Sequence, residues 1–269
     1  MRYMLLCLGW LWAVPAHPAN MADPASLAEA AYRDGRFEAA ADLAEGLETA
    51  AGEALAARAH LVLAAYLAPP PDRMRHLAAA EAAARRAIAQ DPEHVEAMLH
   101  LVIALGYKAR TLSAKAAHRA GFGREAKGLI NEAKMLDPDN PWVYAIEGGW
   151  AGEIIAAAGG ILGRLFYGAS RKGMAAAFDR AQALAPDNPA IKVEYAKVLL
   201  RLNARKYRDQ ALTLLRAAQG LPPHDAFEAL IKAQGKRLLA AMETGSDAKL
   251  AAALASVTPF VEPLLPDGF

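Results

Sequence analysis

The chain has few of the residues that build covalent or metal-based sites. Its one cysteine, Cys7, lies in an apolar run near the N-terminus. We therefore expect no disulfide, no cysteine-ligated metal and no thiol catalysis in the rest of the chain. Aromatic residues make up only 7% of the sequence, and the formal net charge is +1 over 269 residues. That charge is too close to neutral to indicate a nucleic-acid-binding protein.

Patterns of catalytic or metal-binding residues are also scarce. His94 and His100 are six residues apart, whereas zinc-binding histidine pairs on a helix use an i, i+4 spacing. Residues 121–126 fit the letters of a dinucleotide-binding glycine motif, but that motif needs a preceding strand, and the surroundings here read as helical. We interpret this segment as a hinge or helix start, and Glu147 and Glu153 as solvated or interhelix charges. The sequence therefore predicts no catalytic residue, no cofactor, no metal site and no enzymatic activity.

Residues 1–19 differ in character from the rest of the chain. Arg2 gives a positive start, residues 4–14 are an apolar run, and small residues precede a cleavage point near Ala19. This pattern is typical of a signal peptide, and the run is too short to span a bilayer. We expect cleavage of residues 1–19 and a periplasmic protein that does not span the membrane. If Met21 is the true start, the protein is instead cytoplasmic.

Alanine dominates the remaining sequence and favours closely packed helices. Two similar junctions, at residues 137–141 and 185–189, end in Pro-Asp-Asn-Pro. Asn140 and Asn188 are predicted to cap the helices that follow them. The next proline in each case suits the first helical position, where a backbone N–H is not needed.

The junction belongs to a repeat. An alanine five residues before a proline occurs four times, as Ala87/Pro92, Ala133/Pro138, Ala181/Pro186 and Ala218/Pro223. Successive units measure 46, 48 and 36 residues between prolines. The shortest unit is close to the roughly 34-residue period of one class of helix–turn–helix repeat, and the other two each carry an insertion. We therefore predict an all-α, right-handed solenoid of antiparallel helix pairs with two insertions over residues 20–256, and a C-terminal tail at 257–269.

Several local signals refine this prediction. Gly35 is expected to end the first helix, and Asp72 to cap the helix after Pro69-Pro-Pro71. Asp225 and Glu228 form a capping-box pattern, and Ser246 is a predicted N-cap. The second insertion, residues 159–168, contains four glycines, each of which weakens a helix by about 1 kcal/mol relative to alanine. We expect a bend or a packed loop there rather than one continuous helix.

Taken together, these landmarks resemble the tetratricopeptide-repeat (TPR) family over most of residues 25–245. Small residues lie seven positions before three of the repeat alanines, and two bulky residues match the second helix of the repeat: Ala80, Ala126, Ala211, Phe178 and Leu215. The resemblance implies a TPR-like solenoid that binds a protein or peptide.

A narrower resemblance rests on three segments, at residues 167–170, 194–200 and 225–228. They look like the bacterial relatives of the regulator-of-microtubule-dynamics proteins, which are TPR-type solenoids. An exported bacterial protein would not meet a cytoskeletal partner, so this resemblance implies the fold and not that function.

Charge and aromatic residues suggest where a partner would bind. Residues 105–134 carry seven basic and two acidic side chains. This segment is interpreted either as a solvated face or as the lining of a groove for an acidic partner segment. Two tryptophans eight residues apart share a helical face and are either core residues or binding anchors. The candidate partner-binding residues are Lys108, Arg110, Lys115, Trp142, Trp150 and Arg164.

The sequence thus favours an exported TPR-type scaffold that binds a partner protein or peptide, acidic in character, in its concave groove, with no nucleic-acid partner. The alternative is a periplasmic small-molecule or lipid-binding subunit that supports envelope transport. In that case residues 159–168 would roof an apolar cavity under Ile161, Leu162 and Phe166. A closed pocket there would favour ligand binding, and an open groove a scaffold.

Overall fold

The computed structural model of the chain describes residues 23–244 and 246–260. Within these ranges all regular structure is helical and no strand is present. The predicted signal peptide at 1–19 and residues 261–269 of the predicted tail lie outside the described residues. No helix of the described part combines the length and hydropathy that a membrane span requires.

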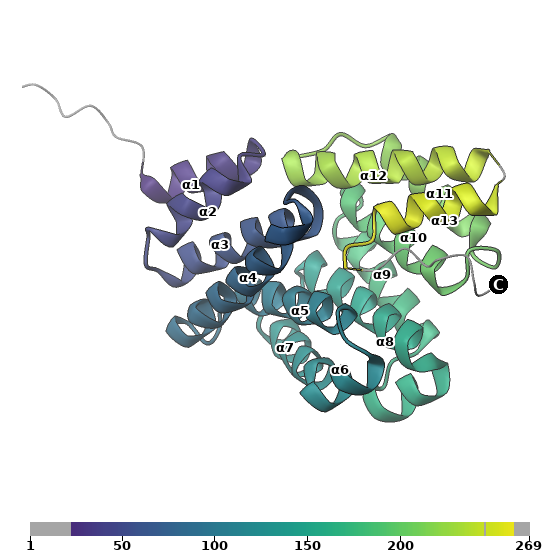
Figure 1. The fold of residues 1–269 in the computed structure, drawn as a ribbon, viewed down its shortest axis with the longest axis horizontal. Coiled ribbons are helices and arrows are strands. Elements are labelled where there is room, and N and C mark those ends of the chain that lie inside the picture. Colours follow the sequence, from purple (N-terminus) through teal and green to yellow (C-terminus); the bar gives the residue numbers. More distant parts are fainter. Residues whose placement is uncertain (1–22, 245, 261–269) are drawn as a thin grey trace, which may run out of the picture.

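The helices form successive antiparallel pairs (Figure 1). The pairs are α1 (Pro24–Arg33) with α2 (Phe37–Glu45), α3 (Ala50–Val62) with α4 (Pro70–Gln90), α5 (Val95–Arg110) with α7 (Phe122–Leu136), α8 (Pro141–Tyr167) with α9 (Arg171–Leu184), α10 (Pro189–Asn203) with α11 (Arg208–Gln219), and α12 (Ala226–Glu243) with α13 (Asp247–Ser256). A π-helical turn, η1 (Leu63–Leu67), continues α3, and the short α6 (Ala114–Ala120) lies in the first predicted insertion. Each pair contacts the next, so the predicted all-α, TPR-like solenoid with two insertions is confirmed.

Local signals place most helix ends where the sequence predicts them. The Oδ1 atom of Asn140 accepts a hydrogen bond of 3.0 Å from the N–H of Trp142, and that of Asn188 accepts one of 3.0 Å from the N–H of Ile191. Such caps stabilise a helix by about 1 kcal/mol each. Gly121 adopts φ +80° between α6 and α7, so its segment is a helix start, one of the two interpretations given above.

The prediction that Asp72 caps α4 is wrong. Pro69 is the N-cap, and Pro70 and Pro71 form the first turn of α4, so Asp72 already lies inside the helix. The reason is that proline has a helix-compatible φ and lacks only an N–H that the first turn does not use. Three consecutive prolines therefore begin this helix rather than only ending the one before.

The predicted capping box at α12 forms only in part. The carboxylate of Asp225 accepts a hydrogen bond of 2.7 Å from the N–H of Glu228, as expected. The Glu228 carboxylate, however, accepts from the backbone N–H of His224 at 2.8 Å rather than from that of Asp225. Its other oxygen accepts a 2.7 Å bond from the side chain of Asn188. Glu228 therefore links the start of α12 to the start of α10.

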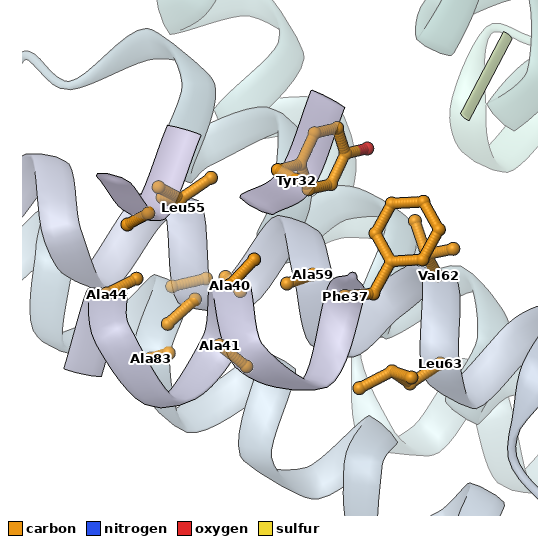
Figure 2. Packing of buried hydrophobic residues seen from close by; sticks show 14 of the residues in the cluster. Tyr32, Phe37, Ala40, Ala41, Ala44, Leu55, Ala59, Val62, Leu63 and Ala83 are labelled. Carbon is orange, nitrogen blue, oxygen red and sulfur yellow. The ribbon is translucent and has the colours of Figure 1, made fainter. Parts of the chain in front are cut away.

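Alanine and glycine bring the helices into close contact. The repeat alanines are buried, as the resemblance to TPR proteins predicts, and Figure 2 shows alanines from α2, α3 and α4 packed beside Tyr32 and Phe37. On α8, a Cβ atom at Gly148 would lie 2.6 Å from Cδ2 of Phe178, and one at Gly152 would lie 2.4 Å from Cγ1 of Val198. The backbone of α8 thus lies directly against side chains of α9 and α10.

The two ends of the solenoid contact each other. Ala226, Phe227 and Leu230 of α12 pack on the core cluster of α1 to α4, and a Cβ atom at Gly35 would lie 3.0 Å from Cβ of Ala226. In Figure 1, α12 runs toward the first helix pair along the upper edge of the molecule. The first helices of successive later pairs contact one another: α3 contacts α5, α5 contacts α8, α8 contacts α10, and α10 contacts α12. We call the face formed by these helices the inner surface.

Candidate partner-binding surface

Charged side chains from three helices meet on the inner surface. We call this group the inner cluster; it consists of Arg110 of α5, Glu153 of α8, and Glu194, Lys197 and Arg201 of α10. The group contains three cations and two carboxylates, so its formal charge is +1. The five residues come from three different repeats, and only the solenoid brings them together.

Glu153 is the centre of the inner cluster. Arg110 binds its carboxylate with both arms of the guanidinium, at 3.0 and 2.8 Å, and Arg201 binds it from the other side, with one contact at 3.2 Å. Burial alone would raise the pKa of Glu153, but the two guanidinium groups outweigh it and lower the pKa to about 2. Glu153 is therefore ionised at any physiological pH. The interpretation of Glu153 as an interhelix charge is confirmed.

Lys197 forms the second half of the inner cluster. Its Nζ atom donates to Oε1 of Glu194 at 2.8 Å and to Oε1 of Gln234 at 3.3 Å, and the side chain is only 5% exposed. Nζ also lies 5.6 Å from the centre of the Tyr66 ring. Burial lowers the pKa of Lys197, while Glu194 opposes that shift. A cation with so little water around it interacts strongly with any further anion that reaches it.

A segment of the chain itself lies on this surface. After α13 the chain turns back toward the centre of the molecule (Figure 1). Arg110 donates a 2.9 Å hydrogen bond to the carbonyl oxygen of Pro259. The ring of Phe260 lies 5.3 Å from that of Tyr107 and 5.1 Å from the guanidinium of Arg73. The start of the predicted tail therefore packs on the inner surface, which sequence reasoning did not anticipate.

The basic segment at 105–134 does not form one groove lined with free cations. Lys108 pairs with Glu81 of α4, and Lys127 and Lys134 both pair with Glu147 of α8. These three cations are paired with carboxylates from other helices, and binding of an acidic partner by the segment stays a prediction. Lys115, on α6, is exposed and lies away from the inner cluster. Of the predicted cations, only Arg110 belongs to that cluster.

Both predicted tryptophans take part in helix packing. Trp150 is 9% exposed, and its indole N–H donates to the carbonyl oxygen of Gly123 at 3.2 Å. Trp142 is half-buried, and its ring lies 6.3 Å from that of Phe227 on α12. The two side chains thus support α8 from opposite partners, α7 and α12. Contact of either tryptophan with a partner stays a prediction.

The second insertion bends as predicted but does not roof a cavity. Gly159 interrupts α8 with φ +77° and ψ 165°, and the helix resumes after it. Ile161, Leu162 and Phe166 are exposed rather than turned toward the core, and Arg164 is exposed beside them. The apolar pocket that the alternative interpretation requires under these residues is not formed within the described part of the chain. The bend folds the segment back so that the ring of Tyr167 lies 6.4 Å from the ring of Trp150, while the three apolar side chains face outward.

Two histidines that looked scattered in the sequence lie together. The Nδ1 atoms of His60 and His76 are 3.0 Å apart. Nε2 of His60 lies 3.1 Å from Glu45, and Nε2 of His76 lies 3.2 Å from Arg75. One Nδ1 donates to the other in this arrangement, so the two rings do not both carry a proton at that atom. In the described part of the chain, no three metal-ligating side chains are placed to share an ion.

A shallow groove of about 620 Å³ runs along α12, beside the end of α11. Its lining consists of Gln219, Pro223, Ala229, Lys232, Ala233, Lys236, Leu239, Ala240 and Glu243. The sequence did not predict this groove, because no motif marks it and it depends only on how α12 packs beside its neighbours.

A comparison with solved structures identifies the fold. The crystal structure of a thermophilic TPR protein of Thermus thermophilus is similar, with a TM-score of 0.56 and 19% sequence identity over 79% of this chain and 97% of that chain. This similarity confirms the TPR-like solenoid. Comparisons with models of protein families and with curated proteins give no match. The resemblance to relatives of the regulator-of-microtubule-dynamics proteins stays a prediction.

Proposed function

We propose that this TPR-like solenoid is an exported binding scaffold that holds a short segment of a partner protein on its inner surface. One observation carries the proposal: the inner surface already holds a short segment of the chain, the turn at residues 257–260, through a backbone carbonyl and an aromatic ring. A surface that binds one short segment in this way has the features needed to bind another.

The same contacts indicate the chemistry of the partner. Arg110 recognises a main-chain carbonyl, and Tyr107 and Arg73 together hold an aromatic side chain. The inner cluster carries one more cation than carboxylates, so an acidic residue near that aromatic side chain would balance its charge. We therefore propose a partner segment that contains an aromatic residue followed or preceded by Asp or Glu.

Residues 257–260 and the partner would compete for the same contacts. A fluorescein-labelled peptide of sequence Ser-Thr-Pro-Phe-Asp-Glu, measured by fluorescence anisotropy, tests this. The Phe260→Ala variant should bind the peptide about tenfold more tightly than the wild type, because the resident ring no longer competes. Tyr107→Leu in the same background should reverse the gain, and Phe166→Ala, an exposed aromatic residue far from the inner surface, is the matched control.

Two outcomes would contradict the proposal. The first is equal peptide affinity for the wild type and Phe260→Ala. The second is a gain in Phe260→Ala that survives Tyr107→Leu, which would place the peptide elsewhere, for instance in the groove along α12. Export is tested separately, by N-terminal sequencing of the protein recovered from the periplasmic fraction. The small-molecule alternative lacks comparable support, since the segment expected to cover a cavity is exposed.

A further inference from the structure

The end of α8 presents a group of exposed apolar side chains. We call it the α8 tip; it consists of Ile161, Leu162, Leu165 and Phe166, which are 85, 50, 73 and 58% exposed. Their i, i+1, i+4, i+5 spacing places them on one face of the helix after the bend at Gly159. Isolated exposed leucines are ordinary, but four adjacent large apolar side chains on a protruding helix end indicate a contact surface.

Cationic side chains surround the α8 tip. Arg164 lies on the same helical segment, and Arg171 reaches within 3.3 Å of the position that a Cβ atom of Gly160 would occupy. The neighbouring α6 contributes the exposed Lys115 and Arg119. Residues 111–124 and 154–178 contain no Asp or Glu. These two segments therefore contribute charges of only one sign to the surroundings of the tip.

The tip is held firmly against α6. The ring of His118 hydrogen-bonds to the hydroxyl of Tyr167, and it lies 5.9 Å from the ring of Phe166. Gly123 allows Tyr167 to pack closely, since a Cβ atom there would lie 2.7 Å from the Tyr167 ring. In Figure 1, α6 and the last turns of α8 lie at the same lower edge of the molecule. One face of the protein thus combines apolar side chains with the cations of two elements.

We propose that the α8 tip docks the protein on an anionic lipid surface. Interfacial segments insert Leu, Ile and Phe into the boundary between headgroups and acyl chains, while flanking Lys and Arg bind anionic headgroups. The tip matches both requirements. It projects outward and offers no groove, so it suits insertion into a fluid interface better than reception of an acidic protein helix. This proposal uses a different face from the inner surface and does not depend on the partner proposed above.

Flotation with lipid vesicles tests the proposal on the full chain. Vesicles of phosphatidylcholine with 30% phosphatidylglycerol are compared with vesicles of phosphatidylcholine alone. The wild type should float with the anionic vesicles and not with the neutral ones. The double variant Ile161→Ser/Leu165→Ser should reduce vesicle binding at least tenfold. The double variant Arg164→Glu/Arg171→Glu should also reduce it more than tenfold, because each cation removed weakens binding about fivefold. Met135→Ser, at an apolar residue that is 77% exposed elsewhere, should bind like the wild type.

The controls keep the outcome clear. All variants alter exposed positions, and unchanged thermal melting by circular dichroism will show that they are folded. Residues 1–19 are identical in every variant, so they cannot cause a difference in flotation between the variants. Equal flotation of the wild type and the tip variants overturns the proposal. Equal binding to neutral vesicles overturns the role of the cations. Binding of an acidic amphipathic peptide of Glu and Leu, without flotation, would reassign the tip to a protein partner.

Discussion

Glu153 should be among the carboxylates on which the stability of this protein depends most. Its side chain is held by two arginines from different helices and is 25% exposed. In Glu153→Gln the two guanidinium groups would face each other without a negative charge between them. Breaking a fully buried ion pair on one side costs about 3–5 kcal/mol of unfolding free energy, and the partial exposure of Glu153 places its loss at the lower end of that range.

The pKa of Glu153 gives a second estimate of the same effect. Its value of about 2 in the folded protein lies below the ordinary value of 4.5. A carboxyl group with a lowered folded pKa stabilises the protein above its unfolded pKa, and this contribution is lost as the pH falls from about 4.5 toward 2. The difference corresponds to about 3 kcal/mol at neutral pH, in agreement with the first estimate. For a chain of this length it should lower the melting temperature by roughly 10 °C.

Thermal melting followed by circular dichroism at pH 7 and at pH 3 measures the effect. Glu153→Gln should melt roughly 10 °C below the wild type at pH 7, and the gap should narrow at pH 3, where the wild type also loses part of this contribution. The matched control is Glu243→Gln, whose exposed pair with Arg216 should contribute less than about 1 kcal/mol. A shift for Glu153→Gln no larger than that of the control would refute the reasoning. Replacing Glu153, Arg110 and Arg201 together by apolar residues should recover much of the loss.

Three further changes have distinct expected outcomes. Gly148→Ala should destabilise the protein by about 1–3 kcal/mol because its new methyl group meets the Phe178 ring of α9, whereas Gly149→Ala, with open space beside it, should stabilise it by up to about 1 kcal/mol. Urea titration measures the unfolding free energy of both variants, and equal changes would be inconsistent with the close packing of α8. Asn188→Ala should lower the unfolding free energy more than Asn140→Ala, because Asn188 is buried and both caps α10 and donates to Glu228 of α12. A loss of only about 1 kcal/mol in each variant, the value of a simple cap, would contradict this. Burial lowers the pKa of His100 to about 3, so the protein should lose stability as the pH falls below 6.5, the pKa of this histidine in the unfolded chain. In chemical denaturation between pH 6.5 and 4, His100→Leu should reduce the dependence of the unfolding free energy on pH. An unchanged dependence would show that His100 does not cause it.

The sequence predicts the fold well where the determining interactions are local. The caps at Asn140 and Asn188, the helix start at Gly121 and the bend at Gly159 each depend on one or two residues. Prolines make helix ends hard to predict, because a proline can either begin a helix or end one. At Pro69-Pro-Pro71 the ability to begin a helix prevails over the ability to end one, and Asp72 therefore falls inside α4.

The binding surface is predicted poorly because it is assembled across repeats. Nothing in the spacing of Arg110, Glu153 and Arg201 shows that they meet, since their positions depend on how three helix pairs stack. The same holds for the basic segment, three of whose cations (Lys108, Lys127 and Lys134) pair with Glu81 and Glu147 from other helices. Local patterns report helix ends, whereas long-range pairing depends on the curvature of the whole array.

The contact between α12 and the first helix pair has a consequence for synthesis. In an open repeat array each unit depends only on its neighbours, so folding can begin anywhere and spread. Here Phe37 and its neighbours emerge early from the ribosome, but the side chains of Phe227 and Leu230 that cover them are translated near the end. Until then the helix pair α1–α2 exposes apolar side chains, which are a target for chaperones and proteases. A nascent chain that stalls before α12 should therefore be degraded even though most of its repeats are complete.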